Sequence, residues 1–453
     1  MEAQRGRASR LSWTALAGLL IAGPCTAQPS PAAAGLHPEV SFTEYPPEAA
    51  GAEIVRRLLT PLAGAQVERA LEASHEELRA ATLDLASERF TVFVPAQEPQ
   101  AGYALLVFIP PWPEAKLPPG WQEALERYST LFVSAARSGN EASDLARRAP
   151  LALVAVANLR HQYRIDPTRI FVGGFSGGAR VALRLALAYP EVFRGALLNA
   201  GSDPIDAGPP SPPPAALLHA FQGSRIVYVT GEEDALHLKM DADSQESLRR
   251  FCQFDYHADV TPKAAHQIAG AAAFAGALHE LATPAPPQPA KLAGCNAALE
   301  QKVAAIEMKV ASARRPRVLC LEWTDPFYVG GHWVPEMVAK AGGEDVLGRA
   351  GEPSFRVTAD EIAASNAEVI VVMPCGYGAA RAAAEFGEFS CERLPESWKE
   401  IPAIRERRIF AVDANSYFSR PGPRLADGVA LLAHILHPGL VPFDLPAKAF
   451  QKI

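Results

Sequence analysis

The chain has 453 residues, a formal net charge of −7, 49% hydrophobic residues and 21% charged residues. This composition supplies enough apolar side chains for packed cores and excludes a disordered chain, a collagen or a coiled coil. The acidic balance and the lack of a long Lys/Arg run argue against nucleic acid as a partner, and the length predicts two or three domains.

Residues 1–27 have the pattern of an export signal. Three arginines precede an apolar stretch at 11–23, and small residues at 25–27 fit a cleavage site. The apolar stretch is too short to span a bilayer, and Pro24 disfavours a lipid anchor on Cys25. The mature chain is therefore expected to have no membrane span and to be periplasmic or secreted.

The next segments predict a tether and a first α/β domain. Residues 28–50 are rich in proline and alanine, which predicts a flexible tether, and 52–88 have a helical period. Strands are predicted at 90–95, 103–109, 129–134, 169–175, 195–198 and 225–230, and helices at 151–162 and 177–189. Because strands that alternate with helices form parallel sheets, residues 51–282 are predicted to be one α/β domain.

A proline-rich run at 283–289 predicts a linker, which we place at 283–295. A helical stretch at 296–313 then precedes a second α/β pattern. Its predicted strands are 317–322, 368–372 and 408–412, and its predicted helices are 333–341 and 424–436. Residues 296–453 are thus expected to form a second α/β domain.

Five of the six cysteines follow the export signal, so at least one thiol is left without a disulfide partner. Cys320 lies in an apolar run and is predicted to be a buried small hydrophobe. Cys375 with Cys391 is the pair to test first. No cysteine spacing resembles a zinc site, and no metal is expected.

Residues 174–178 read Gly-Phe-Ser-Gly-Gly, which matches the pattern G-x-S-x-G. An apolar strand leads directly into Ser176 and a helix begins directly after it. In such a turn the serine backbone is strained, and glycines on both sides remove side chains that would collide. This setting predicts that Ser176 is a nucleophile, although a glycine-rich strand-to-helix turn without catalytic function is the alternative.

The acid and the histidine of such a site follow the serine along the chain. Asp234 comes just after a predicted strand, and Glu232 and Glu233 are close enough to remain alternatives. His266 lies on a loop before a helix, whereas His257 lies in a strand-like segment and is interpreted as structural. The predicted triad is therefore Ser176, Asp234 and His266.

The predicted chemistry is acyl transfer on a small-molecule ester, without a cofactor. Ser176 attacks the carbonyl, His266 takes the serine proton, and Asp234 orients the imidazole. The oxyanion needs two backbone donors, of which Gly177 supplies one. The second is expected in the loop 110–112, where Trp112 is the only residue with a backbone N–H because the other two are prolines.

Residues 88–282 resemble an exported esterase of the polyhydroxybutyrate-depolymerase type within the α/β-hydrolase superfamily. The strand 103–109, the segment Ile-Asp-Pro-Thr-Arg at 165–169 and the motif at 174–178 carry this resemblance. Such enzymes commonly have a His-Gly step in the oxyanion loop, where this chain has Pro-Pro-Trp.

Residues 315–447 resemble the C-terminal lobe of periplasmic cobalamin-binding proteins, which are substrate-capture components of ABC importers related to iron-chelate binders. The resemblance rests on segments 321–327, 331–336 with 341–343, and 412–424, and the helix 296–313 resembles the connector between lobes in that family.

This resemblance implies cobalamin or an iron chelate as ligand and an ABC permease as partner, with Glu336 as the acidic docking residue. A flat macrocycle is well served by aromatic faces near strand ends. The candidate ligand-binding aromatics are Trp323, Phe327, Trp333, Tyr417 and Phe418. Core packing is the alternative for each aromatic, and a solvated carboxylate is the alternative for Glu336.

The leading hypothesis is an exported serine hydrolase with an appended ligand-binding lobe, because the order Ser–Asp–His is complete. One alternative is a binding component of a cobalamin or iron-chelate ABC importer whose hydrolase half is silent. The hydrolase occupies the place of the first lobe of such a binding protein. The other alternative is a gene fusion whose two halves do not cooperate.

Overall fold

The computed structural model describes residues 33–59, 83–205, 217–253, 255–283, 289–419, 422–442 and 444–453, together with Gly64, Val67, Ala70 and Leu71. The predicted export signal at 1–27 lies outside the described residues. Within the described part of the chain, no helix is both long and apolar enough to cross a membrane.

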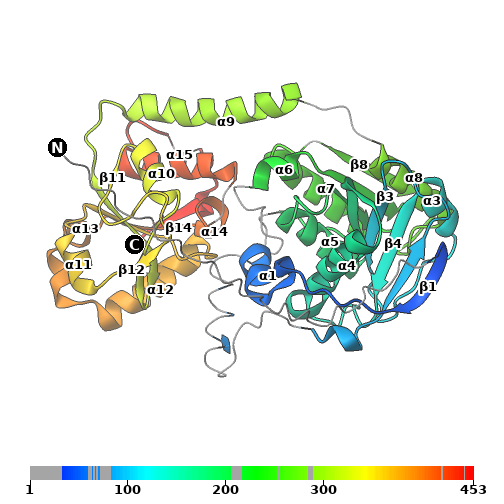
Figure 1. Cartoon of the computed structure of the whole chain (residues 1–453). Coiled ribbons are helices and arrows are strands. Elements are labelled where there is room, and N and C mark those ends of the chain that lie inside the picture. The colour runs from blue at the N-terminus through cyan, green and yellow to red at the C-terminus, as the bar shows by residue number, and fades with distance from the viewer. Residues whose placement is uncertain are drawn as a thin grey trace, which may run out of the picture. The chain divides into compact units, whose positions relative to one another are not determined.

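The first domain is built on a sheet for which eight strands are described, in the order β1-β2-β4-β3-β5-β6-β7-β8 (Figure 1). The strands are β1 Gly35–Val40, β2 Phe90–Val94, β3 Tyr103–Ile109, β4 Thr130–Ala135, β5 Ile165–Phe175, β6 Gly195–Asn199, β7 Arg225–Gly231 and β8 Tyr256–Thr261. β4, β3, β5, β6, β7 and β8 run parallel, whereas β1 and β2 are antiparallel to their neighbours. The predicted parallel α/β architecture is confirmed.

Helices cover both faces of this sheet. They are α1 Gly51–Leu58, α3 Gln122–Arg127, α4 Ala149–Gln162, α5 Gly177–Ala188, α6 Leu218–Gln222, α7 Ala235–Arg250 and α8 Ala271–Ala282. Alternate residues of a strand point to opposite faces. Leu105 and Val107 of β3 accordingly join the core under α4 and α5, while Leu106 and Phe108 join the core under α3 and α8.

The predicted tether at 28–50 is wrong over its described part from residue 35 onward. β1 pairs with β2, and Phe42 is buried with its ring 4.5 Å from that of Phe90. β1 is a half-exposed edge strand, so its sequence carries no apolar alternation that composition would reveal. The predicted helical region 52–88 contains α1, and most of its remainder lies outside the described residues.

The second domain contains a sheet for which seven strands are described. The path is β12-β10-β9-β13-β14-β15, and β11 pairs with β9. The strands are β9 Arg317–Thr324, β10 Phe327–Val329, β11 Glu344–Asp345, β12 Phe355–Arg356, β13 Val369–Val372, β14 Ile409–Val412 and β15 Phe450–Lys452. β9, β13 and β14 are parallel and form the buried centre, as the sequence predicts.

The helices of the second domain again lie on both faces of its sheet. They are α9 Pro289–Val310, α10 Val334–Lys340, α11 Ala359–Ala364, α12 Ala379–Arg393, α13 Pro402–Arg405, α14 Ala414–Tyr417 and α15 Arg424–Leu436. One core cluster contains residues of α9, α10 and α15, and the other contains residues of α11 and α12. Val318 and Leu319, neighbours on β9, belong to different clusters.

The predicted linker at 283–295 is too long, because α9 begins at Pro289. Proline is well tolerated in the first turn of a helix, where its missing N–H would have no partner within the helix. Ile306 and Val310 of α9 are buried in the core of the second domain. This helix therefore packs as part of that domain at its C-terminal end.

Cys252 and Cys295 form a disulfide with a Cα–Cα distance of 6.0 Å, a pairing that the sequence did not indicate. Cys320 is buried, as predicted, and Cys375 is buried as well. The side chain of Cys391 lies outside the described residues, so the Cys375–Cys391 pair stays a prediction.

Candidate active site

Ser176 lies in a sharp turn between β5 and α5. Its φ of 54° and ψ of −122° are a strained conformation for a residue with a side chain. A Cβ on Gly174 would lie 2.3 Å from the carbonyl carbon of Gly178, and a Cβ on Gly178 would lie 1.9 Å from the Ile109 oxygen. Backbone packing therefore requires both glycines of the G-x-S-x-G pattern.

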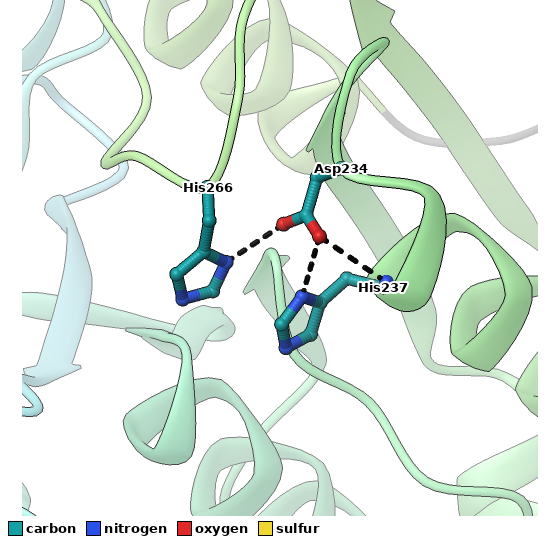
Figure 2. Close-up of side chains that lie close together, drawn as sticks. All are labelled: Asp234, His237 and His266. Atoms are coloured by element: carbon teal, nitrogen blue, oxygen red, sulfur yellow. Dashed lines mark hydrogen bonds and ion pairs between the residues drawn. The ribbon is translucent and has the colours of Figure 1, made fainter.

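The structure brings Ser176, His266 and Asp234 together at the carboxyl edge of the parallel sheet. His266 Nε2 lies 3.1 Å from Ser176 Oγ, and His266 Nδ1 lies 2.7 Å from Asp234 Oδ2. Asp234 follows β7, and His266 lies on the loop after β8. Figure 2 shows the Asp234–His266 contact. Three residues from distant parts of the sequence thus form one continuous set of polar contacts.

The contacts distinguish the candidate acids and histidines. Asp234 is 7% exposed, whereas Glu232 and Glu233 are exposed. Glu232 accepts a hydrogen bond from the backbone N–H of Lys263. His257 is exposed on β8. The carboxylate in contact with His266 is that of Asp234.

A second imidazole, from His237, shares the same carboxylate (Figure 2). His237 Nδ1 lies 2.8 Å from Asp234 Oδ1, and its ring stacks on His266 with centroids 4.3 Å apart and an interplanar angle of 18°. His237 is not among the site residues that the sequence predicts. The available signal was its position three residues after Asp234 at the start of α7, a spacing at which helical neighbours meet.

The charge of Asp234 is stabilised by its partners. Burial raises the pKa of this carboxyl, but the hydrogen bonds from His237 and His266 outweigh burial and hold the pKa below its ordinary value. Asp234 is consequently ionised at neutral pH and acts as a hydrogen-bond acceptor for both rings.

Asn199, at the end of β6, connects the serine turn to the histidine loop. Its backbone oxygen accepts from Ser176 N–H at 2.9 Å, and its Oδ1 accepts from Ala269 N–H at 2.7 Å. Its Nδ2 donates to the Val229 oxygen at 2.9 Å. This buried side chain fixes the loop that carries His266, and no local sequence pattern identified it.

The predicted oxyanion residues lie on neighbouring segments. Gly177 is the first residue of α5, and a Cβ there would lie 2.3 Å from Asn140 Oδ1. The backbone N–H of Asn140 donates to the Pro111 oxygen at 3.1 Å, directly before Trp112. The half-buried Trp112 ring lies 6.2 Å from that of Phe175. Asn140 therefore lies between the loop of Trp112 and the turn of Gly177.

The buried guanidinium of Arg148 holds the loop at 110–112 in place. Its guanidinium donates to the Pro110 oxygen at 3.2 Å and to the Ser138 oxygen at 3.0 Å, and it pairs with Asp144 at 3.1 Å. Burial lowers the pKa of Arg148 despite its ion pair with Asp144. The buried cation thus joins the loop after β3 to the segment that carries Asn140.

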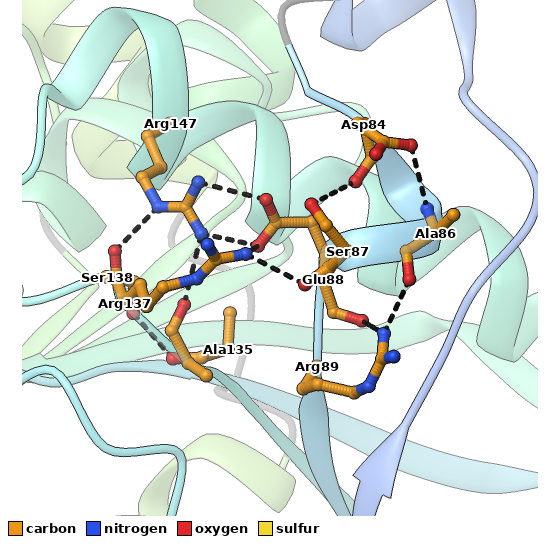
Figure 3. A network of polar contacts seen from close by, with 10 residues as sticks. Asp84, Ala86, Ser87, Glu88, Arg89, Ala135, Arg137, Ser138 and Arg147 are labelled. Carbon is orange, nitrogen blue, oxygen red and sulfur yellow. Dashed lines mark hydrogen bonds and ion pairs between the residues drawn. The ribbon is translucent and has the colours of Figure 1, made fainter.

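The buried carboxylate of Glu88 supports the segment that carries Arg147 (Figure 3). Glu88 is buried and accepts from both terminal nitrogens of Arg147, and Arg137 Nη2 lies 3.1 Å from its Oε2. Arg147 Nε also donates to the Arg137 oxygen at 2.7 Å. These contacts fix the turn just before Arg148.

The five candidate aromatics of the second domain do not form one group. Trp323 and Phe327 pack on the cluster with α11 and α12, whereas Trp333, Tyr417 and Phe418 belong to the cluster with α9, α10 and α15. Phe418 is 3% exposed and lies in the core cluster, which favours the core-packing alternative for it, and its role in ligand binding stays a prediction. The core-packing alternative describes it, because a Cβ on Gly428 of α15 would lie 3.3 Å from the Phe418 ring.

Two of the tryptophans already have polar partners. Trp333 Nε1 donates to the Phe418 oxygen at 2.8 Å, and Trp323 Nε1 donates to the Asp325 oxygen at 3.0 Å. A pocket of about 590 Å³ lies at the end of β9 and is lined in part by Phe327, Arg356 and Phe389. Glu336 is exposed in the first turn of α10.

Residues 139–275 match the model of the Phospholipase/Carboxylesterase family, Abhydrolase_2. No curated protein matches the sequence at a significant level. The matched region includes the serine turn, the acid and the histidine loop. The match identifies an α/β-hydrolase fold in the first domain and supports an ester-hydrolysing enzyme.

Solved structures resemble parts of the chain. S-formylglutathione hydrolase FrmB from Staphylococcus aureus has 13% identity and a TM-score of 0.35, with 43% of this chain and 93% of that chain covered. The TroA-like periplasmic binding protein FepB from Veillonella parvula has 12% identity and a TM-score of 0.31, with 58% and 87% covered. An ABC transporter substrate-binding protein from Listeria monocytogenes has 15% identity and a TM-score of 0.31, with 60% and 94% covered.

Proposed function

We propose that the protein is an exported serine hydrolase that cleaves small carboxylic esters through Ser176, His266 and Asp234. The observation that carries the proposal is the unbroken set of contacts from Ser176 Oγ to His266 Nε2, at 3.1 Å, and from His266 Nδ1 to Asp234, at 2.7 Å. These are the distances and the order that a serine nucleophile, its base and an orienting acid need.

In the proposed mechanism, Ser176 Oγ attacks the ester carbonyl carbon while His266 Nε2 takes the serine proton. The N–H groups of Gly177 and Trp112 donate to the developing oxyanion. His266 then returns the proton to the leaving alkoxide, and an acyl-enzyme remains. A water molecule then attacks the acyl carbon while His266 takes a proton from it. His266 returns this proton to Ser176 Oγ as the acid leaves.

The openness of the site favours small, accessible ester groups. The side chain of His266 is 39% exposed, so the base can be reached from solvent.

Two features support export to the periplasm or beyond. One is the signal pattern at 1–27, and the other is the Cys252–Cys295 disulfide, a bond typical of oxidising compartments.

Capture of cobalamin or an iron chelate by the second domain is a second candidate function. The pocket of about 590 Å³ beside Phe327 supports it, because its volume is in the range of small-molecule sites. Exposed Glu336 would then dock on an ABC permease. Titration of the full chain with cyanocobalamin, followed by its visible absorption, tests this function. An unchanged spectrum at saturating protein would contradict it.

The hydrolase proposal is tested by turnover of 4-nitrophenyl acetate and butyrate with the purified protein and its Ser176→Ala variant. We expect saturable hydrolysis by the wild type and a loss of about 10⁴-fold or more in kcat for the variant. Circular dichroism of both proteins controls for folding. An equal rate for the two folded proteins would overturn the proposal.

A further inference from the structure

His237 makes two contacts with the proposed triad, although it is not a member of it. Its Nδ1 lies 2.8 Å from Asp234 Oδ1, and its ring stacks on the His266 ring with centroids 4.3 Å apart. An ionised carboxylate only accepts hydrogen bonds, so both imidazoles donate to Asp234 from Nδ1. Each oxygen of the carboxylate therefore has one imidazole donor (Figure 2).

The imidazole of His237 is the strong donor to Asp234 Oδ1. The backbone N–H of His237 also points to this oxygen, but at 3.4 Å that contact is long and weak. Burial raises the pKa of Asp234, and the hydrogen bond from the His237 side chain is the largest effect that lowers it. Without the imidazole, a buried and charged oxygen would lose its main partner, and the carboxylate would gain freedom to rotate.

Two stacked rings hold the imidazole of His266. The Phe175 ring lies 5.0 Å away, centroid to centroid, at an interplanar angle of 30°, and the His237 ring stacks at 18°. His266 comes from a loop, and its Nε2 lies 3.1 Å from Ser176 Oγ. The stacked neighbours oppose rotations of the His266 ring that would turn Nε2 away from the serine.

We propose that His237 is a positioning residue, which fixes the carboxylate of Asp234 so that His266 stays oriented toward the nucleophile. It acts first through the shared carboxylate and second through the stacked ring. Orientation of this kind affects kcat, because a small misplacement of a base slows proton transfer. The catalytic role of His237 rests on the proposed function, whereas the sharing of one carboxylate by two imidazoles does not.

NMR of the full chain labelled with ¹⁵N-histidine tests the shared carboxylate without any turnover. We expect His237→Phe to remove one exchange-protected imidazole N–H proton and to shift the one that belongs to His266, because both protons bond to Asp234. His266→Phe should do the reverse. His257→Phe, at an exposed histidine of β8, is the matched control and should change neither signal. A His266 proton that keeps its chemical shift in His237→Phe would overturn the inference.

Steady-state hydrolysis of 4-nitrophenyl butyrate tests the effect on catalysis. We expect His237→Phe, which keeps a stacked ring but has no donor, to lower kcat by about tenfold or more at unchanged KM. His237→Asn, whose amide places a donor near the position of Nδ1, should recover most of this loss, and His257→Phe should match the wild type. Circular dichroism controls for folding.

Equal losses of kcat in folded His237→Phe and His237→Asn would assign the effect to packing alone and overturn the inference. A wild-type kcat in His237→Phe would overturn it as well. An inactive wild type that still shows the two coupled N–H protons would overturn the proposed function, and with it the catalytic role of His237, while the shared carboxylate would stand.

Discussion

Both domains place distinctive side chains near the carboxyl ends of parallel strands, but they use them differently. In the first domain, Ser176, His266 and Asp234 come from three strand ends and contact one another directly. In the second domain, the candidate aromatics are divided between the two core clusters, and Phe418 is buried. Position at a strand end therefore indicates a site only when the side chains converge on one point.

The buried polar groups also differ between the two domains. In the first domain Glu88, Arg148 and Asn199 make hydrogen bonds that hold the loops of the site. In the second domain, burial raises the pKa of Asp345 to about 6.

Replacing the acid should have the largest effect. We expect Asp234→Asn to lower kcat by about 10⁴-fold, because the amide no longer favours the tautomer with a proton on His266 Nδ1. Glu233→Gln, at an exposed carboxylate one residue earlier, is the matched control and should leave kcat unchanged. Steady-state kinetics on 4-nitrophenyl butyrate measure both. Equal losses in the two variants would contradict the assignment of the acid.

Removing the Phe418 ring should strongly destabilise the second domain. We expect Phe418→Ala to lower its free energy of unfolding by about 3–5 kcal/mol, because the ring is buried and its loss leaves a cavity. Hydrogen exchange of peptides from β9 and β13 reports this local stability. Unchanged exchange together with weaker cobalamin binding would make Phe418 a ligand-binding residue.

The ionisation of Asp345 should make the second domain less stable as the pH rises. Burial raises its pKa from 3.8 to about 6, so the folded state holds the proton more tightly than the unfolded state. The protonated carboxyl therefore stabilises the folded state fully below pH 4. The free energy of unfolding falls as the pH rises through 6, by about 3 kcal/mol in total.

Asp345→Asn should remove this pH dependence, since the amide oxygen can still accept from Leu347 N–H and Gly348 N–H. The measurement is hydrogen exchange in β9 of the variant relative to the wild type at pH 4.5 and pH 7.5. We expect the variant to gain protection relative to the wild type at the higher pH. A constant ratio at both pH values would refute the account.

Asn199→Ala should have the smallest effect on stability. We expect a loss of about 1–3 kcal/mol, because Ala269 N–H and the Val229 oxygen lose a buried partner. The freed loop should also lower kcat more than it changes KM, since it carries His266. Thermal unfolding and steady-state kinetics give the two effects. A stability loss with unaltered kcat would make Asn199 structural only.

The residues of the candidate site in the first domain could be predicted because they follow local sequence patterns. The G-x-S-x-G turn, the acid after a strand and the histidine on a loop are each visible within a few residues. The structure places these side chains in contact. The choice among Glu232, Glu233 and Asp234 needed the structure, because three adjacent carboxylates differ only in burial and direction.

Features that depend on long-range packing could not be predicted. In the sequence, Asn199 is an ordinary asparagine at the end of a strand, and only the structure shows its hydrogen bond from Ala269 N–H. His237 has the sequence position of a helical surface residue, and only the structure shows that its ring stacks on His266. The strand β1 could not be predicted, because its segment has the composition of a tether. Sequence also does not show whether an aromatic near a loop turns into the core, as Phe418 does.

An activated Ser176 should react with a serine-reactive fluorophosphonate. The measurement is the intact mass of the treated, purified protein beside a Ser176→Ala control. We expect a single adduct on the wild type and none on the variant. An unmodified wild type in a well-folded sample, or equal labelling of both proteins, would contradict it.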